Sequence, residues 1–241
     1  IGTDGGFMAA PVEVPELLLA PGERADTIID FSGLAAGATL LLTNDAPAPF
    51  PGGDAPDPRT LGSVMQLRVV PLAAPDASAV PARLADIPAL GPATVTRTLT
   101  LEESMGPKGP MVMLLDGKRW SDPASETPRL GSTEVWELVN LTEDTHPIHL
   151  HLVQFQVLGR QAINAHEYME ARAGDRPLAR YLTGPPRPAE AFERGWKDTV
   201  RADPKAVTRI IVRFAPIGGG AYPFDAGAAP GYVWHCHMLE H

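Results

Sequence analysis

The chain has 241 residues, 44% of them hydrophobic, which is enough for a buried core in one large domain or two of ordinary size. Its formal net charge of -9 argues against a nucleic acid or an anionic membrane as partner, because both bind clustered Lys and Arg. No apolar run reaches the length of a bilayer-spanning helix. The single cysteine excludes an internal disulfide and gives no positive sign of an oxidising compartment.

Short apolar segments separated by turn residues predict a chain made mostly of strands. Turn signals such as Ala20-Pro21-Gly22 and Asp116-Gly117 lie between them, and no segment shows a convincing helical period. Many short strands with frequent turns indicate an all-β sandwich or barrel. The expected strands are 13–19, 24–31, 38–43, 63–70, 94–101, 111–115, 133–140, 148–152, 154–158, 207–214 and 232–237.

Residues 73–93 are rich in Ala and Pro, interrupt the strand pattern and are the best candidate for an interdomain linker. Residues 94–241 are long enough for a complete sandwich, whereas residues 1–72 fit the C-terminal strands of a domain whose start is missing. The chain begins without an initiator Met and ends at His241, which is itself a candidate ligand. We therefore expect a fragment of a larger protein.

Two long loops are expected in the second half of the chain. Residues 162–195 are too long for a simple connector, so this loop is either functional or a solvated surface insertion. His166 within it is expected to be a surface histidine. Residues 215–231, which are rich in Gly, Ala and Pro, predict a plain loop before the last strand.

The segment His235-Cys236-His237 is the strongest functional signal, because it places the only cysteine of the chain between two histidines. Successive side chains of a strand point to opposite faces, so His235 and His237 face one way and Cys236 the other. One short strand can therefore serve two metal centres.

A second histidine cluster lies upstream, where His149 and His151 share a strand face and His146 precedes them. Cysteine, two histidines and a weak axial ligand form the set that selects copper for electron transfer, and neutral imidazoles also suit copper. We therefore favour copper. The alternatives are a zinc site, which leaves too many of these ligands unused, and a structural thiol with unrelated histidines.

Six stretches of sequence carry a family resemblance: THPIHLHLVQFQVLGR (145–160), GWKDTV (195–200), GYVWHCHMLEH (231–241), IGTDGG (1–6), LAPGERADTIIDF (19–31) and LLDGKRWSDPASETPRLGSTEVW (114–136). The sequence resembles the C-terminal part of a multicopper oxidase, of the bacterial spore-coat laccase and bilirubin oxidase type. This resemblance implies cupredoxin-like Greek-key β-sandwich domains, with residues 1–72 as the end of the second and residues 94–241 as the third.

The resemblance also implies a role for each residue of the two clusters. It makes Cys236, His235 and His237 the catalytic residues, because Cys236 and its two neighbours offer electrons a covalent route between two copper centres. The implied ligands are His146, Cys236 and His241 for a mononuclear blue copper, His149 for a type 2 copper, and His151, His235 and His237 for the type 3 pair of a three-copper cluster.

The activity implied is laccase-like: one-electron oxidation of phenolic or aromatic amine donors, coupled to four-electron reduction of dioxygen to water. Dioxygen and a small aromatic reductant would be the partners, residues 162–195 are a candidate wall of the substrate pocket, and the location implied is extracellular, periplasmic or the spore coat. The alternative function is a cupredoxin-type electron carrier that binds copper but has no oxidase activity.

Two departures from the family limit what this chain would do alone. The usual axial Met follows the final histidine by a few residues, and the chain ends at His241. The family also takes half of the cluster's histidines from two H-x-H motifs in a first domain that this chain lacks. We therefore expect that the isolated chain does not reduce dioxygen at a useful rate. Asp198 is a candidate for orienting a metal ligand or for handling protons, although a role in a turn or in binding backbone groups is the favoured interpretation.

Overall fold

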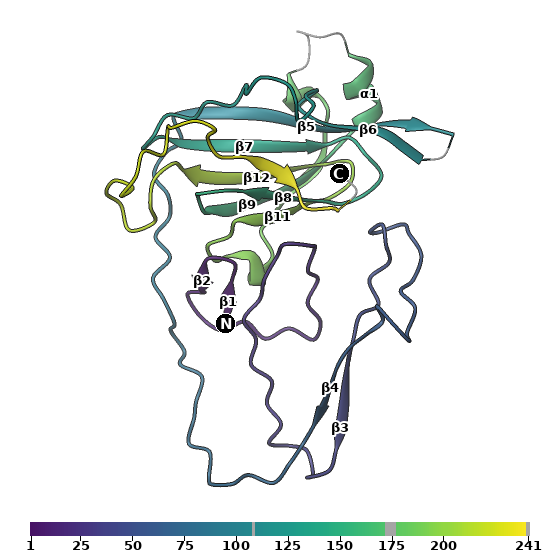
Figure 1. Ribbon diagram of the computed structural model, residues 1–241, viewed down its shortest axis with the longest axis vertical. Helices are drawn as coiled ribbons and strands as arrows, with labels where there is room; N and C mark the ends of the chain where they lie inside the picture. Colours follow the sequence, from purple (N-terminus) through teal and green to yellow (C-terminus); the bar gives the residue numbers. More distant parts are fainter. Residues whose placement is uncertain (108, 172–176, 240–241) are drawn as a thin grey trace.

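The computed structural model describes residues 1–107, 109–171 and 177–239. Residues 95–236 form two packed β-sheets (Figure 1). The larger sheet has six strands in the order β10-β9-β12-β7-β5-β6, and the smaller has three in the order β11-β8-β13. Their bounds are β5 Val95–Gly106, β6 Gly109–Leu115, β7 Thr133–Asn140, β8 His146–Leu150, β9 Phe155–Ile163, β10 Leu182–Pro188, β11 Thr199–Ala202, β12 Ala206–Arg213 and β13 Trp234–Cys236.

The topology is that of an antiparallel sandwich with one parallel pair. Strands β5 and β7 run parallel, whereas β7 pairs with β12 and β12 with β9 in antiparallel register. The expected strand 133–140 coincides with β7, and β8 begins at His146, two residues before the expected start. The prediction of an all-β fold is confirmed.

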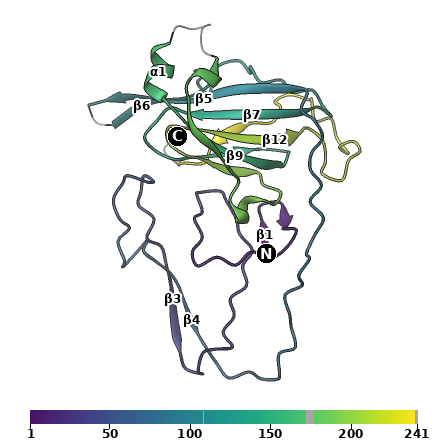
Figure 2. The same ribbon diagram turned by 180° about the vertical axis from the view of Figure 1, so that it is seen from behind.

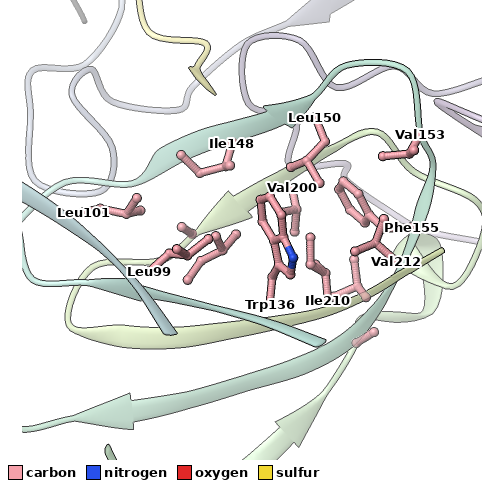
Figure 3. Close-up of a cluster of buried hydrophobic side chains, with 14 residues drawn as sticks. Leu99, Leu101, Trp136, Ile148, Leu150, Val153, Phe155, Val200, Ile210 and Val212 are labelled. Carbon is pink, nitrogen blue, oxygen red and sulfur yellow. The ribbon is translucent and has the colours of Figure 1, made fainter. Parts of the chain in front are cut away.

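A single apolar core fills the space between the two sheets (Figure 3). Alternate residues of β7 and β12 point into it, among them Trp136, Leu138, Ile210 and Val212, and all four are at most 2% exposed. Each large side chain buried in this way stabilises the fold by about 1.5–3 kcal/mol. The strand that carries the cysteine is held against this core, because Trp234 and Cys236 both pack on it.

Residues 1–72 have little core of their own. They contain two short hairpins, β1 Gly2–Thr3 with β2 Gly6–Phe7 and β3 Thr39–Thr43 with β4 Ser63–Arg68. Strands β3 and β4 lie far from the sandwich and are largely exposed (Figures 1 and 2). Residues 73–93, the expected linker, form no strand and run back along the molecule, where the Pro88 carbonyl accepts a hydrogen bond from Gln156. The division into domains stays a prediction.

Two expected strands, 13–19 and 24–31, are wrong. Only an isolated bridge between Gly2 and Asp26 joins this segment to a strand. Its backbone groups bind side chains instead: the Ala20 N–H donates to Glu23, and the Arg24 N–H donates to Asp4. With these donors occupied, no continuous ladder forms.

The expectation of no helix is also wrong, and the described parts of the loop 162–195 contain regular structure. It contains helix α1 Ala165–Glu170, the 3-10 helices η1 Leu178–Arg180 and η2 Ala191–Glu193, and strand β10. Asn164 caps α1 with its side chain, and a helix of this length leaves almost no periodic signal in the sequence. Strand β10 contains three prolines and lies at the sheet edge, where proline is tolerated.

Among the residues described, the structure has no helix that is long and apolar enough to cross a membrane.

Candidate metal centre

The smaller sheet separates the candidate ligands onto two faces. In the register of β13 against β8, Cys236 lies opposite Ile148 and His235 lies opposite His149. Side chains alternate along each strand, so Cys236, His146 and Ile148 face the core, whereas His149 and His235 face away from it. This is the division that the strand argument predicted for the cysteine and its neighbours.

On the core face, Cys236 and His146 lie side by side. The Cys236 Sγ is 3.6 Å from the His146 Nδ1, and His146 is only 4% exposed. The other ring nitrogen of His146, Nε2, is 2.7 Å from the Thr142 hydroxyl and 3.4 Å from the Glu103 carboxylate. With Nε2 as the hydrogen-bond donor to these oxygens, Nδ1 presents its lone pair to the thiol.

Burial raises the pKa of the Cys236 thiol to about 11, so the thiol is protonated at neutral pH when no metal is bound. A coordinating metal removes that proton, because the thiolate is the ligand. The third expected ligand of this centre, His241, lies outside the described residues.

On the opposite face, four histidines form a cluster. The ring centroid of His149 lies 4.9 Å from that of His151, 5.4 Å from that of His235 and 5.8 Å from that of His237. The Nε2 atoms of His151 and His235 are 3.2 Å apart. One nitrogen from each of His149, His151 and His235 lies within 4.8 Å of the other two. The fold thus brings together all four histidines that the family resemblance assigned to one cluster.

Asp198 holds the ring of His149 in one orientation. The His149 Nδ1 is 3.0 Å from both the Asp198 carbonyl oxygen and the Thr199 hydroxyl, and 3.3 Å from the Asp198 carboxylate. Since these are acceptors, Nδ1 carries the proton and Nε2 presents a lone pair to the cluster. The favoured interpretation of Asp198 as a turn residue is therefore incomplete, because its carboxylate lies beside a candidate ligand.

The neighbours of Asp198 keep its carboxyl group ionised. Burial alone would raise the pKa of this carboxyl group, but hydrogen bonds from Arg24, His149 and Thr199 outweigh it and hold the pKa well below its usual range. Asp198 is consequently a carboxylate throughout the physiological range of pH.

A protein-family model for multicopper oxidases matches residues 91–241. The chain belongs to the multicopper oxidase family. Over its full length it is 42% identical to a laccase from Bacillus subtilis and 39% identical to multicopper oxidase LPR1 homolog 1 from Oryza sativa, and it covers 43% of each. It therefore spans less than half the length of these relatives.

Solved structures of multicopper oxidases share the cupredoxin-like fold of this chain. The McoA multicopper oxidase from Aquifex aeolicus matches all of the chain with a TM-score of 0.70 at 30% identity, over 46% of its own length. A multicopper oxidase from Campylobacter jejuni matches 99% of the chain with a TM-score of 0.71, over 45% of its own length. At 19% identity this second likeness shows the fold alone.

The donor atoms of this multicopper oxidase chain suit copper. The core face offers a thiol and an imidazole, the soft pair that selects copper, and the other face offers imidazoles. Burial and the neighbouring imidazoles lower the pKa of His151, which keeps the ring neutral. The separation between the His151 and His235 nitrogens also lets both rings bind one metal ion, because two nitrogens on a tetrahedral ion such as zinc, with bonds of about 2.0–2.1 Å, lie roughly 3.3 Å apart.

The other residues that the sequence analysis singled out lie away from the two faces that carry the candidate ligands. His166 is exposed on α1, as expected of a surface histidine, and α1 itself packs on a second small core through Tyr168. The candidate substrate-pocket wall, residues 162–195, stays a prediction. Sequence reasoning missed Thr142 and Glu103 beside His146. Thr142 is only four residues from His146, but Glu103 lies on the distant strand β5 and only the fold brings it to this ring.

Proposed function

We propose that this chain is the C-terminal portion of a laccase-like copper oxidase, which oxidises phenolic or aromatic amine donors by single electrons and reduces dioxygen to water. One observation carries the proposal: the small sheet, with the residues that directly follow β8 and β13, presents a thiol and an imidazole on one face and four imidazoles on the other. A simple electron carrier needs only the first of these sets.

The proposed ligands follow the two faces. The mononuclear blue site would use His146 and Cys236 together with His241, which lies outside the described residues. On the other face, His149 would hold a type 2 copper, and His151, His235 and His237 would hold a type 3 pair. When bound, copper supplies the one-electron chemistry, accepting electrons from the donor and passing them to dioxygen.

The protein's own groups orient these ligands and connect them. Thr142 and Glu103 fix the ring of His146, and Asp198 with Thr199 fixes that of His149. Cys236 is joined to a histidine of the opposite face through one peptide bond on each side, so the shortest covalent path between the two faces runs through its backbone. The apolar core packs against one side of the partly buried Cys236.

The histidine face is incomplete without a further domain. His151 and His237 are exposed, and the relatives are more than twice as long as the chain. We propose that residues 1–72 are the end of a second cupredoxin domain, residues 73–93 a linker and residues 94–241 the third domain. Another domain of the whole protein would then cover the exposed imidazoles and supply the other half of the cluster ligands.

Copper loading of the 241-residue chain tests the blue site. We expect an intense absorption band in the red from charge transfer between the Cys236 sulfur and copper(II), and no colour after loading with zinc. Cys236→Ser should abolish the band while the four-histidine face still binds copper. A copper-loaded chain whose thiol is intact but which lacks the band would refute this part of the proposal.

The oxidase activity is tested in two steps. Steady consumption of dioxygen by the copper-loaded chain alone would contradict the proposal that it holds half of a cluster. A chimera that joins this chain to the part of the Bacillus subtilis laccase that it does not match should oxidise a phenol and consume dioxygen. A chimera that shows the red band but consumes no dioxygen would contradict the proposed activity.

A further inference from the structure

A tight turn from the N-terminal segment lies against the histidine face. The Ala20 carbonyl accepts a hydrogen bond of 3.0 Å from the Glu23 N–H, with Pro21 and Gly22 as the two central residues. Gly22 has a φ of +86°, so this is the arrangement of a type II turn, in which the second central position requires a positive φ. We call residues 20–24, which read Ala-Pro-Gly-Glu-Arg, the PGER turn.

Gly22 touches the ring of His237 directly. A Cβ atom placed on Gly22 would lie 2.6 Å from the His237 Cδ2 and 2.8 Å from its Cγ, closer than real carbon atoms approach. Only a residue without a side chain therefore fits between the turn and this ring. The backbone of the turn limits how far the His237 ring tilts toward it.

Arg24 acts on a second histidine of the same face. Its two terminal nitrogens donate to the two carboxylate oxygens of Asp198, at 2.7 and 2.6 Å. That carboxylate lies beside the His149 Nδ1 and accepts a hydrogen bond of 2.8 Å from the Thr199 hydroxyl. A fork with two parallel bonds fixes both the position and the plane of the carboxylate, which one bond does not.

The turn is itself fastened to strand β11 by buried charges. The Glu23 carboxylate lies 3.2 Å from the Lys197 Nζ, and the Asp4 carboxylate lies 3.0 Å from the same atom. Asp4 also accepts hydrogen bonds from the backbone N–H groups of Asp198 and Thr199. The Asp4 and Glu23 side chains are 0% and 2% exposed, so water does not compete for these contacts.

We propose that the PGER turn positions two of the four histidines, with Gly22 in contact with His237 and Arg24 acting on His149 through Asp198. Gly22 and Arg24 are positioning residues, and the N-terminal segment becomes part of the metal face. The inference rests on the proposed function, because it requires that this face binds copper. Docking of the segment and binding of the metal then stabilise one another.

The test measures copper(II) affinity in the full 241-residue chain, in a Cys236→Ser background that removes the thiol. Arg24→Ala and Gly22→Ala should each weaken binding by about 10- to 100-fold, the usual effect of losing a group that orients a metal ligand. Arg24→Lys should recover only part of the affinity, because lysine keeps the charge and loses the fork. Electron paramagnetic resonance of the bound copper should change with the same variants.

Two matched controls separate positioning from damage to the fold. Arg59→Ala breaks a similar exposed fork with Asp57, and Gly37→Ala strains a glycine at a φ of +90° that has open space around it. Both should bind copper as the parent does. Arg24 is about half exposed, so Arg24→Ala should leave the midpoint of urea unfolding nearly unchanged. A loss of copper affinity without a change in this midpoint indicates that Arg24 positions the ligands, because a purely structural role would lower both.

The outcomes are distinct. Parent-like copper affinity and resonance spectra in both Arg24→Ala and Gly22→Ala would overturn the positioning role and leave the proposed function standing. If the Cys236→Ser parent itself binds no copper through histidine, the proposed function fails and the inference fails with it.

Discussion

The sandwich buries a continuous apolar core between two sheets, whereas residues 1–72 bury only Met8 among their hydrophobic side chains. What the N-terminal segment buries instead is charge. Its Asp4 and Glu23 carboxylates lie against Lys197 of the sandwich, and all three side chains are at most 3% exposed. The first region is ordered by apolar packing and the second by polar contacts with the first. The two regions should therefore respond differently to loss of volume, to loss of charge and to pH.

The largest effect is expected at a buried ion pair inside the sandwich. Both terminal nitrogens of Arg160 donate to Glu193, at 2.7 and 2.6 Å, and both side chains are at most 4% exposed. Glu193→Gln leaves the buried guanidinium with only the longer contact of 3.5 Å to the Asp203 carboxylate and should lower the free energy of unfolding by about 3–5 kcal/mol. Urea unfolding measures this change, and Glu190→Gln is the control, because Glu190 is 45% exposed and should cost less than about 1 kcal/mol.

The same pair fixes the sign of a pH dependence. Burial alone would raise the pKa of Glu193, but the hydrogen bonds and charge of Arg160, with the charge of Arg201, hold it below its ordinary value of 4.5. The contribution of the pair is therefore complete above pH 4.5 and is lost as the pH falls through the folded-state pKa. Glu193→Gln should flatten this part of the stability curve, and an unchanged slope would contradict the assignment.

The two regions can be compared by truncating one leucine side chain in each and measuring the loss of stability. Leu138 on β7 is 0% exposed and Leu42 on β3 is 44% exposed. Leu138→Ala should cost about 2–5 kcal/mol because it leaves a cavity in the core. Leu42→Ala should stay within about 0.5 kcal/mol, as surface changes do. Equal losses in urea unfolding of the 241-residue chain would show that β3 is packed in solution and would remove the distinction.

The sequence predicted the sandwich well because its strands have a recognisable local composition. Residues 133–140 and 207–214 are short segments rich in β-branched and aromatic residues, and the structure has β7 and β12 there. The alternation of side chains along a strand puts Cys236 and His235 on opposite faces. Strand propensity and the direction of successive side chains are local properties, so they are predictable without knowing which strands pair.

The N-terminal segment and the surroundings of the ligands were not predictable from the sequence, because they depend on contacts between distant residues. Residues 24–31 have the composition of a strand. In the structure, however, the backbone N–H of Arg24 donates to Asp4 and its guanidinium donates to Asp198, so Arg24 does not pair with a neighbouring strand. Ala20-Pro21-Gly22 was recognised as a turn, yet nothing local indicates that His237 lies against it. Such contacts join residues that are distant in sequence, and they depend on the whole fold.

A small effect is expected when a charge is removed at the boundary between the two regions. Burial raises the pKa of Glu23, and the charges of Lys197 and Arg201 with the Ala20 N–H offset only part of this rise. Glu23→Gln should lower the free energy of docking of the segment by only about 1 kcal/mol. The reason is that Lys197 is still paired with Asp4, and Arg201 with Glu190, after the substitution. Protease cleavage within residues 1–72 measures this change, because docking of the segment protects it.

The pH dependence at Glu23 runs opposite to that at Glu193. A carboxyl group whose folded-state pKa lies above 4.5 contributes stability that is complete below that pH and is lost as the pH rises through the folded-state value. Protection of residues 1–72 by Glu23 should therefore weaken as the pH rises through this window, and Glu23→Gln should remove that trend. A trend of the same sign as at Glu193 would mean that the attraction of Lys197 and Arg201 outweighs burial at this boundary. Glu23 would then stabilise the fold through its charge, as Glu193 does in its pair with Arg160.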